Sequence, residues 1–202
     1  MLMKKYFLLA FCLLVMASGA FALDMTVGAG GMFNYSTTYG KWEDAGNSLE
    51  WSLSRLGYGG YAFFGVSRFF EFNLGLLYKK ANTVTFKGGD MGSDTQDASD
   101  WGSALAVQFG VYFKYPFNIS ERLVIFPTVG IDYEFSLADA SEGWWDDLWL
   151  RGGAGLDVFL TERIFLRGHI VYGAAYPLRG AKEDNLYLTH GFLGKLGVGW
   201  LF

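Results

Sequence analysis

The feature that most constrains this chain is an alternation of large apolar residues with small or polar ones. Within residues 101–115, for example, Leu105 and Val107 alternate with Ala104 and Ala106. Successive side chains of a β-strand point to opposite faces, so a period of two predicts strands rather than helices. The alternation recurs along the chain and predicts strands at about 24–36, 51–66, 69–86, 101–115, 123–136, 148–160, 164–176 and 187–202.

The second face of these strands is unlike the surface of a soluble sheet, whose polar face meets water. It is rich in Gly and Ala with isolated charges, and the chain of 202 residues has 28 Gly and 19% aromatic residues. Small residues suit a crowded interior, and large apolar residues suit lipid, which is the pattern of transmembrane strands. A bilayer does not tolerate open sheet edges. The sequence therefore predicts an all-β fold, a closed antiparallel up-and-down transmembrane β-barrel of eight strands.

The connectors between the predicted strands alternate in length. Short polar turns fall at 67–68, 118–122 and 161–163, and long connectors fall at 37–50, 87–100, 137–147 and 177–186. Short turns at one end and long loops at the other are typical of outer-membrane barrels. Pro127 lies within a predicted strand and lacks the N–H that a ladder needs, so we expect a bulge or a local break there.

The first 22 residues are predicted to be a cleaved signal peptide. Lys4 and Lys5 precede an apolar run, and Ala20 and Ala22 form a small-x-small cleavage pattern. The apolar run is shorter than the ~20 residues that a spanning helix needs.

We expect residues 23–202 to form one outer-membrane β-barrel domain. The single Cys, Cys12, lies in the segment expected to be removed, so the mature chain has no thiol nucleophile and no disulfide. The formal net charge of −4 gives no general attraction to nucleic acid.

The last strand carries a resemblance to a known family. Val198, Trp200 and Phe202 alternate up to a terminal Phe, which resembles the assembly signal of bacterial outer-membrane proteins. With the signal peptide and the strand pattern, the whole mature chain resembles the small OmpA/OmpX/OmpW-type barrels. The resemblance implies a location in the bacterial cell outer membrane. It implies the lipid bilayer and the barrel-assembly machinery as partners, and it implies four external loops with both termini on the periplasmic side. We expect a monomer.

The candidate site consists of the charged residues on the strand face that carries the small residues, because this face is expected to point into the barrel. Asp157 and Arg167 lie five residues on either side of Glu162, so a hairpin centred there places them directly opposite each other. The set acts either as a salt-bridge plug that gates a narrow pore or as a polar network that fills the interior, and we favour filling because eight strands leave room for side chains only. The expected inward residues are Glu71, Lys79, Lys114, Asp132, Glu134, Arg151, Asp157, Arg167, His169 and Lys195.

The sequence gives little support to an enzyme. The two His residues, His169 and His190, are expected to face inward and outward respectively, and no Ser-His-acid arrangement is visible. We therefore predict no catalytic residues, no cofactor and no metal. Asp94 and Asp97 belong to an acidic loop without the spacing of an EF-hand, which is solvated or holds a cation.

The predicted function is a non-enzymatic outer-membrane barrel with a structural or surface-interaction role, whose surface ligand stays open. The alternative is an OmpW-like narrow channel for small hydrophobic molecules. Its motivation is a group of bulky residues expected inside the barrel, Tyr61, Phe63, Leu77 and Phe159, which are able to line an apolar pocket.

The predicted strands have a direct spectroscopic test. The purified protein in detergent should show a predominantly β circular dichroism spectrum, and its gel mobility should change on boiling because the closed sheet resists the detergent until it is heated. A predominantly helical spectrum would contradict the prediction.

Overall fold

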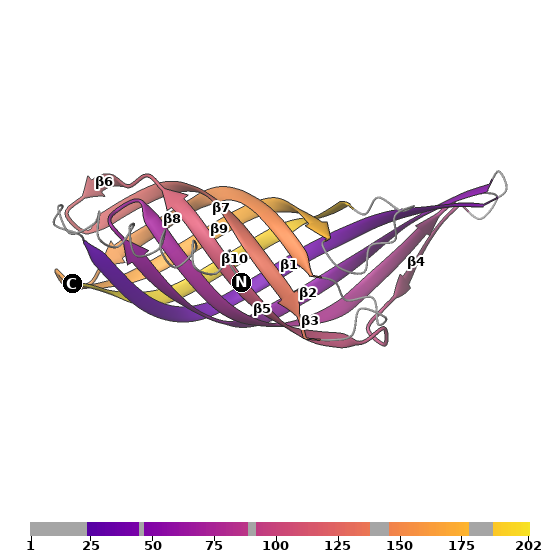
Figure 1. Ribbon diagram of the computed structural model, residues 1–202, viewed down its shortest axis with the longest axis horizontal. Helices are drawn as coiled ribbons and strands as arrows, with labels where there is room; N and C mark the ends of the chain where they lie inside the picture. Colours follow the sequence, from indigo (N-terminus) through magenta and orange to yellow (C-terminus); the bar gives the residue numbers. More distant parts are fainter. Residues whose placement is uncertain (1–23, 45–46, 89–91, 138–145, 178–187) are drawn as a thin grey trace, which may run out of the picture.

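One antiparallel sheet makes up the fold (Figure 1). The structure is a computed structural model that describes residues 24–44, 47–88, 92–137, 146–177 and 188–202, and within them it holds ten strands. The strands are β1 (Met25–Asp44), β2 (Asn47–Val66), β3 (Phe70–Lys87), β4 (Ser93–Asp97), β5 (Ser103–Lys114), β6 (Phe117–Ser120), β7 (Leu123–Ser136), β8 (Asp147–Phe159), β9 (Ile164–Pro177) and β10 (Leu188–Leu201). In the described part of the chain, no helix is long and apolar enough to cross a membrane.

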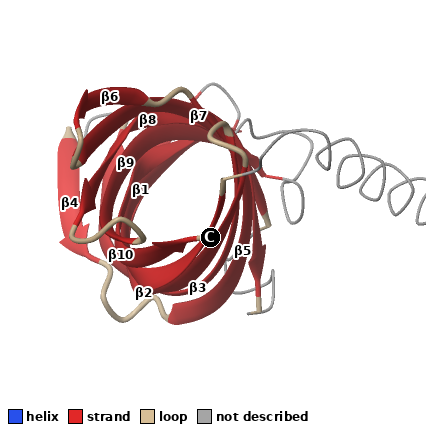
Figure 2. Cartoon of the chain, turned by 90° about the vertical axis from the view of Figure 1, so that its left-hand side faces the viewer, coloured by secondary structure: helices blue, strands red, loops and turns tan. Residues whose placement is uncertain are grey.

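The hydrogen bonds of the sheet run around a ring, as the end-on view shows (Figure 2). The order is β1–β2–β3–β5–β7–β8–β9–β10, and β10 pairs back to β1, with every pairing antiparallel. The all-β antiparallel prediction is confirmed. The predicted count of eight strands is wrong for the sheet as a whole, because β4 and β6 are two short additional strands that pair with β3 and β7 outside the ring.

The first two strands are much longer than the sequence predicts. Residues 37–50 were expected to form a long loop, but β1 continues to Asp44 and β2 begins at Asn47. β1 and β2 have 20 residues each and β3 has 18, whereas β5 and β7 to β10 have 12 to 14. One wall therefore projects beyond the rest of the ring, with β4 alongside it (Figure 1). The alternation fades in this projecting wall, which is why the pattern did not mark it as strand.

The irregularity expected at Pro127 is present, but in the neighbouring strand. β7 runs without a register shift past Pro127, which pairs with Ala154 of β8. On the other side, β5 ends at Lys114 and β6 begins at Phe117. The Pro127 carbonyl accepts a hydrogen bond from the Tyr115 backbone N–H at 3.1 Å, in the gap between these two strands. The missing N–H of Pro127 thus falls where its neighbour leaves the regular ladder.

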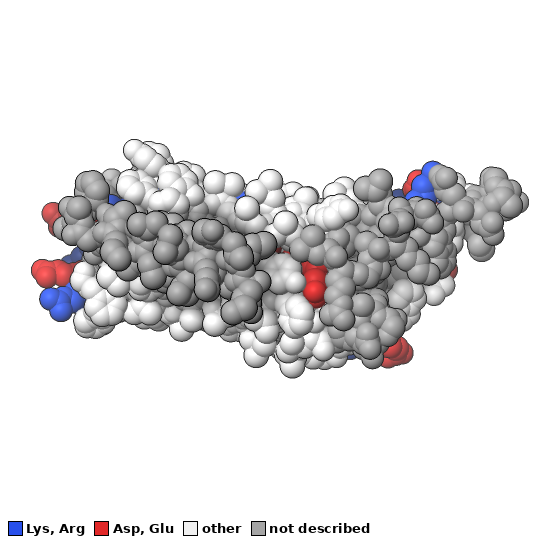
Figure 3. Space-filling view, viewed as in Figure 1, with Lys and Arg blue, Asp and Glu red and all other residues white. Residues whose placement is uncertain are grey.

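The outer face of the ring is apolar. Leu150, Ile170 and Leu196 are 64%, 60% and 69% exposed, and they stand for a set of outward aliphatic and aromatic side chains on the ring strands. The visible wall is mostly free of charge, with charged groups gathered mainly toward the two ends (Figure 3). The inner face carries the buried charges described below. The sheet is therefore inverted relative to a soluble one, with its apolar side exposed and its polar side enclosed.

The last strand closes the ring. Val198, Trp200 and Phe202 all point outward, and the Phe202 backbone N–H donates to the Met25 carbonyl at 3.0 Å. The residues of the predicted signal peptide, with the expected cleavage positions Ala20 and Ala22, lie outside the described residues.

Two adjacent glycines of β2 test how tightly the ring is curved. A Cβ at Gly59 would lie 1.9 Å from the Leu76 carbonyl oxygen, whereas a Cβ at Gly60 would meet no atom closer than the Gly30 oxygen at 3.6 Å. Gly59→Ala should therefore lower the free energy of unfolding by about 1–3 kcal/mol through overpacking. Gly60→Ala should leave it unchanged or raise it by up to about 1 kcal/mol. Urea titrations in detergent measure both changes, and equal effects would contradict the predicted difference.

Candidate functional site

The ten inward residues expected from the sequence are all at least nine-tenths buried in the structure. The register of the strands places most of these residues in three layers, which follow one another along the axis of the ring. The short-turn layer contains Glu71, Lys114, Asp157 and Arg167; the central layer contains Tyr112, Asp132, Arg151 and Lys195; the loop-side layer contains Arg55, Lys79, Glu134 and Asp147.

The short-turn layer is a fully paired charge cluster. Asp157 and Arg167 are direct partners in the β8–β9 ladder, as their spacing predicts. Arg167 donates from Nε to Asp157 Oδ1 at 2.7 Å and from Nη2 to Oδ2 at 2.6 Å, and it also donates from Nη1 to Glu71. Lys114 Nζ lies 3.0 Å from Glu71 Oε2. Two carboxylates and two cations therefore balance each other, with a bidentate Arg fork as the main link.

The central layer gathers two cations around one carboxylate. Arg151 Nε lies 2.8 Å from Asp132 Oδ2, and the Tyr112 hydroxyl donates to the same carboxylate. The Arg151 guanidinium lies over the Trp149 ring, 3.9 Å from the ring centroid. Lys195 Nζ lies 4.6 Å from the centroid of the Tyr112 ring. The central layer thus relies on aromatic faces as well as on charge.

The loop-side layer is built around Lys79 and Glu134, which form an ion pair. Asp147 is the ladder partner of Glu134 and is 6% exposed. Arg55 donates from Nη1 to Thr38 Oγ1 at 2.8 Å.

Sequence reasoning missed Arg55 and Asp147. Counting back from Phe63 in steps of two reaches Arg55, so the alternation held a signal that went unused. Arg55 adjoins a register shift between β2 and β3 in which the extra residue is Asn82 of β3, so the alternation of β2 itself is not interrupted. Asp147 was assigned to a loop, but it is the first residue of β8.

The two His residues lie on opposite faces of the wall, so they do not share a site. His169 is 6% exposed and its ring lies 5.3 Å from the Tyr112 ring. His190 stacks on Tyr39 at 5.4 Å, and its Nδ1 lies 2.8 Å from the Tyr172 hydroxyl. Within the described ranges, no group of three or more His, Cys, Asp or Glu side chains is placed to hold a metal ion.

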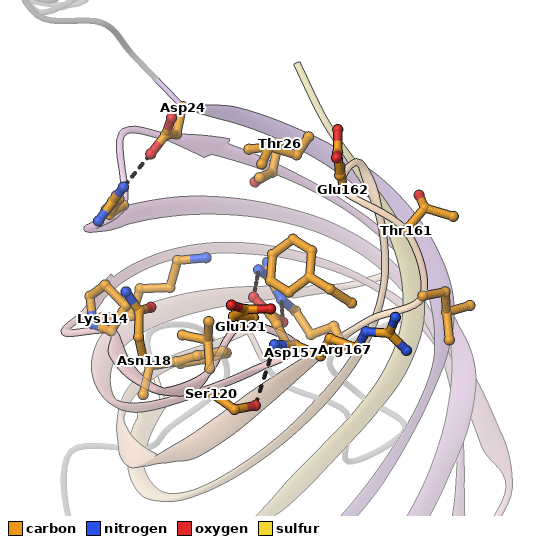
Figure 4. A pocket seen from close by; sticks show the side chains of 18 of the residues that line it. Asp24, Thr26, Lys114, Asn118, Ser120, Glu121, Asp157, Thr161, Glu162 and Arg167 are labelled. Atoms are coloured by element: carbon orange, nitrogen blue, oxygen red, sulfur yellow. Dashed lines mark hydrogen bonds and ion pairs between the residues drawn. The ribbon is translucent and has the colours of Figure 1, made fainter.

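A cavity of about 970 Å³ lies at the short-turn end (Figure 4). Lys114, Asp157 and Arg167 of the short-turn layer line it, together with turn residues such as Glu121 and Glu162. At the loop-side layer, a second cavity measures only about 10 Å³, which is barely room for one water molecule. The cavity at the short-turn end is therefore far larger than the one at the loop-side layer.

Apolar side chains fill the space between the charged groups. Tyr61, Phe63 and Leu77, which were expected to face inward, belong to one buried cluster, and Phe159 packs against it. The cluster also contains Met32, Tyr112, Phe165, Val171 and Leu193.

The acidic loop forms local hydrogen bonds. The Ser99 backbone N–H donates to Asp97 Oδ1 at 2.8 Å, and this bond lowers the pKa of the exposed Asp97 carboxyl. Gln96 Nε2 donates to Asp94 Oδ2 at 2.7 Å. The bond between Ser99 and Asp97 stabilises the turn after β4.

No family model matches the chain, and no curated protein matches it. Among solved structures, it is similar to the outer membrane protein OprG of Pseudomonas aeruginosa, with 13% identity over 90% of this chain and 96% of that one and a TM-score of 0.47. The N-terminal β-barrel domain of OprF from the same organism gives 16% identity, coverage of 87% and 99%, and a TM-score of 0.40. The outer membrane protein AlkL gives 13% identity, coverage of 89% and 90%, and a TM-score of 0.41.

The short-turn layer makes a prediction about stability. Arg167→Met leaves Glu71 and Asp157 buried without their main partner, so the free energy of unfolding should fall by about 3–5 kcal/mol. The matched control is Arg68→Met, because Arg68 pairs with Asp24 at 2.8 Å while their side chains are 63% and 42% exposed. That exposed pair should contribute no more than about 1 kcal/mol. Urea unfolding of both variants measures the difference, and similar losses would show that the short-turn layer is not a stabilising network.

Proposed function

We propose that the protein is a non-enzymatic β-barrel of the bacterial outer membrane with a structural or surface-interaction role. The observation that carries this proposal is the inverted, closed sheet. Its ring strands expose large apolar side chains outward, and its charged side chains are buried inside. A bilayer explains both the inversion and the closure of the sheet. Lipid favours an apolar outer wall, and it forbids sheet edges without hydrogen-bond partners.

The two ends of the ring support an orientation for the proposed barrel. The short turns connect β2 to β3 and β8 to β9, and the C-terminus lies at the same end (Figure 1). We assign this end to the periplasm, with Val198, Trp200 and Phe202 as the signal for the barrel-assembly machinery. The projecting wall of β1, β2 and β3 then extends outside the cell and offers the surface for a partner, whose identity stays open.

The interior supports a filled barrel rather than an open pore. Ion pairs join non-adjacent strands in the short-turn and loop-side layers, Asp132 and Arg151 of the neighbouring strands β7 and β8 pair in the central layer, and apolar side chains pack between the charged groups. An eight-stranded ring leaves an interior just wide enough for such side chains. We therefore interpret the charged layers as a polar filling and not as a gate.

The alternative, a narrow channel for small hydrophobic molecules, has less support. Tyr61, Phe63 and Leu77, which motivated an apolar pocket, pack against one another as a core. The large cavity is lined by charged residues such as Lys114 and Arg167 as well as by apolar ones, and of the four bulky residues that motivated the pocket only Phe159 lines it.

Fractionation and electrical recording test the proposal together. The expressed chain should enter the outer-membrane fraction, and the purified protein in planar bilayers should give no stable large conductance, because the three layers block the interior. Recovery in the soluble fraction would refute the membrane barrel. Correct insertion with a stable large conductance would retain the barrel and refute the filled interior. Uptake of a hydrophobic tracer into vesicles that contain the protein would favour the alternative.

A further inference from the structure

Lys195 is a buried cation whose partners differ from those of the other interior lysines. Lys79 and Lys114 each form an ion pair with a glutamate, whereas Lys195 has no ion pair and its Nζ has no hydrogen-bond acceptor among the described residues. Its side chain is 5% exposed. The aromatic faces of Tyr112 and Tyr61, with centroids 4.6 and 5.5 Å from Nζ, are its neighbours. Aromatic faces attract a cation but accept little hydrogen bonding, so Lys195 retains donor capacity.

Arg151 adds further unused donors to the same layer. Its Nε faces Asp132 at 2.8 Å, an ion pair whose angle falls outside that of a hydrogen bond. Its Nη1 and Nη2 have no acceptor within the described part of the chain, and neither does the indole N–H of Trp149. Arg151 and Trp149 are 1% and 0% exposed. Buried donors without acceptors are costly, so this group calls for an acceptor between them.

The carboxylate of the central layer forms no hydrogen bond with Lys195 among the described residues. Lys195 interacts electrostatically with Asp132 and Glu71 and also with Arg151, and Asp132 is the carboxylate that it shares with Arg151. Asp132 Oδ2 is bound by the Tyr112 hydroxyl and paired with Arg151, whereas Asp132 Oδ1 has no hydrogen-bond partner among the described residues. The formal charge of the layer is therefore positive by one, whereas the short-turn layer is balanced. An uncompensated buried charge is unfavourable, and an ion of opposite sign removes this cost.

We propose that the central layer binds a small inorganic anion of the size of chloride between Lys195 Nζ and the Arg151 guanidinium. A monatomic anion supplies the missing negative charge and accepts several hydrogen bonds at once. Tyr61 and Tyr112 lie against Lys195 Nζ and Met32 is the ladder partner of Lys195, so these packed surroundings favour so small a ligand over an organic acid. The proposal needs only the closed interior, so it stands or falls separately from the outer-membrane assignment.

Bromide is the probe for a direct test. Crystals of the full mature chain grown in sodium bromide should show an anomalous scattering peak between Lys195 Nζ and the Arg151 guanidinium. The absence of a peak there would overturn the proposal and would leave ordered water as the partner of these donors. This arm needs no variant, so it remains decisive even where a substitution disturbs folding.

Thermal unfolding at constant ionic strength gives an independent arm. A ligand that binds only the folded state raises the unfolding midpoint with its concentration. Chloride or bromide, exchanged for gluconate, should therefore raise the midpoint of the wild-type chain in a saturable way. Lys195→Met should abolish this response, while Lys80→Met, which removes an exposed lysine of β3, should retain it. An equal halide response in the wild type and in Lys195→Met, or no response in the wild type, would overturn the proposal.

Discussion

The pairing of β10 with β1 is the constraint on which the rest of the structure depends. It gives every ring strand two neighbours, so the sheet has no open edge in the ring. Closing only eight strands requires strong curvature, which crowds the inner face. The cost appears at Gly30 and Gly59, where a Cβ would lie 2.0 and 1.9 Å from a carbonyl oxygen of the adjacent strand. Small residues inside and large residues outside are therefore consequences of closure.

Closure also decides how the charged residues must be arranged. Once the interior is sealed from solvent, each ionised side chain loses hydration and needs a partner. Arg167 of β9 reaches Glu71 of β3, and Lys79 of β3 reaches Glu134 of β7. These links join parts of the wall that are not neighbours in the sheet. The same demand makes the central layer unusual, because its two cations face a single carboxylate, and it is there that we place an anion.

The ring is not uniform along its axis. The cavity at the short-turn end and the projecting wall of β1, β2 and β3 lie at opposite ends (Figure 1). In the proposed barrel, the first faces the periplasm and the second faces the exterior. The filled interior separates them, which favours interaction at the two ends over passage between them. A structural or surface-interaction role follows more naturally from this arrangement than transport does.

The sequence by itself determined the strand type and the inward face of the ten predicted residues, because a period of two is a local property of an extended backbone. It also determined the pairing of Asp157 with Arg167, because a short hairpin sets the register of the residues on either side of it.

The projecting wall was not predictable, since residues 37–44 have no alternation of large and small residues to mark them as strand. Arg55, by contrast, was predictable, because β2 keeps its alternation and the extra residue of the neighbouring register shift, Asn82, lies in β3. Only the tertiary structure decided that Glu71 meets Arg167, 96 residues away, and that Lys195 lies against Tyr112 instead of a carboxylate. Such partners depend on how the strands are staggered around the closed ring, and that stagger is a property of the whole sheet rather than of any one segment.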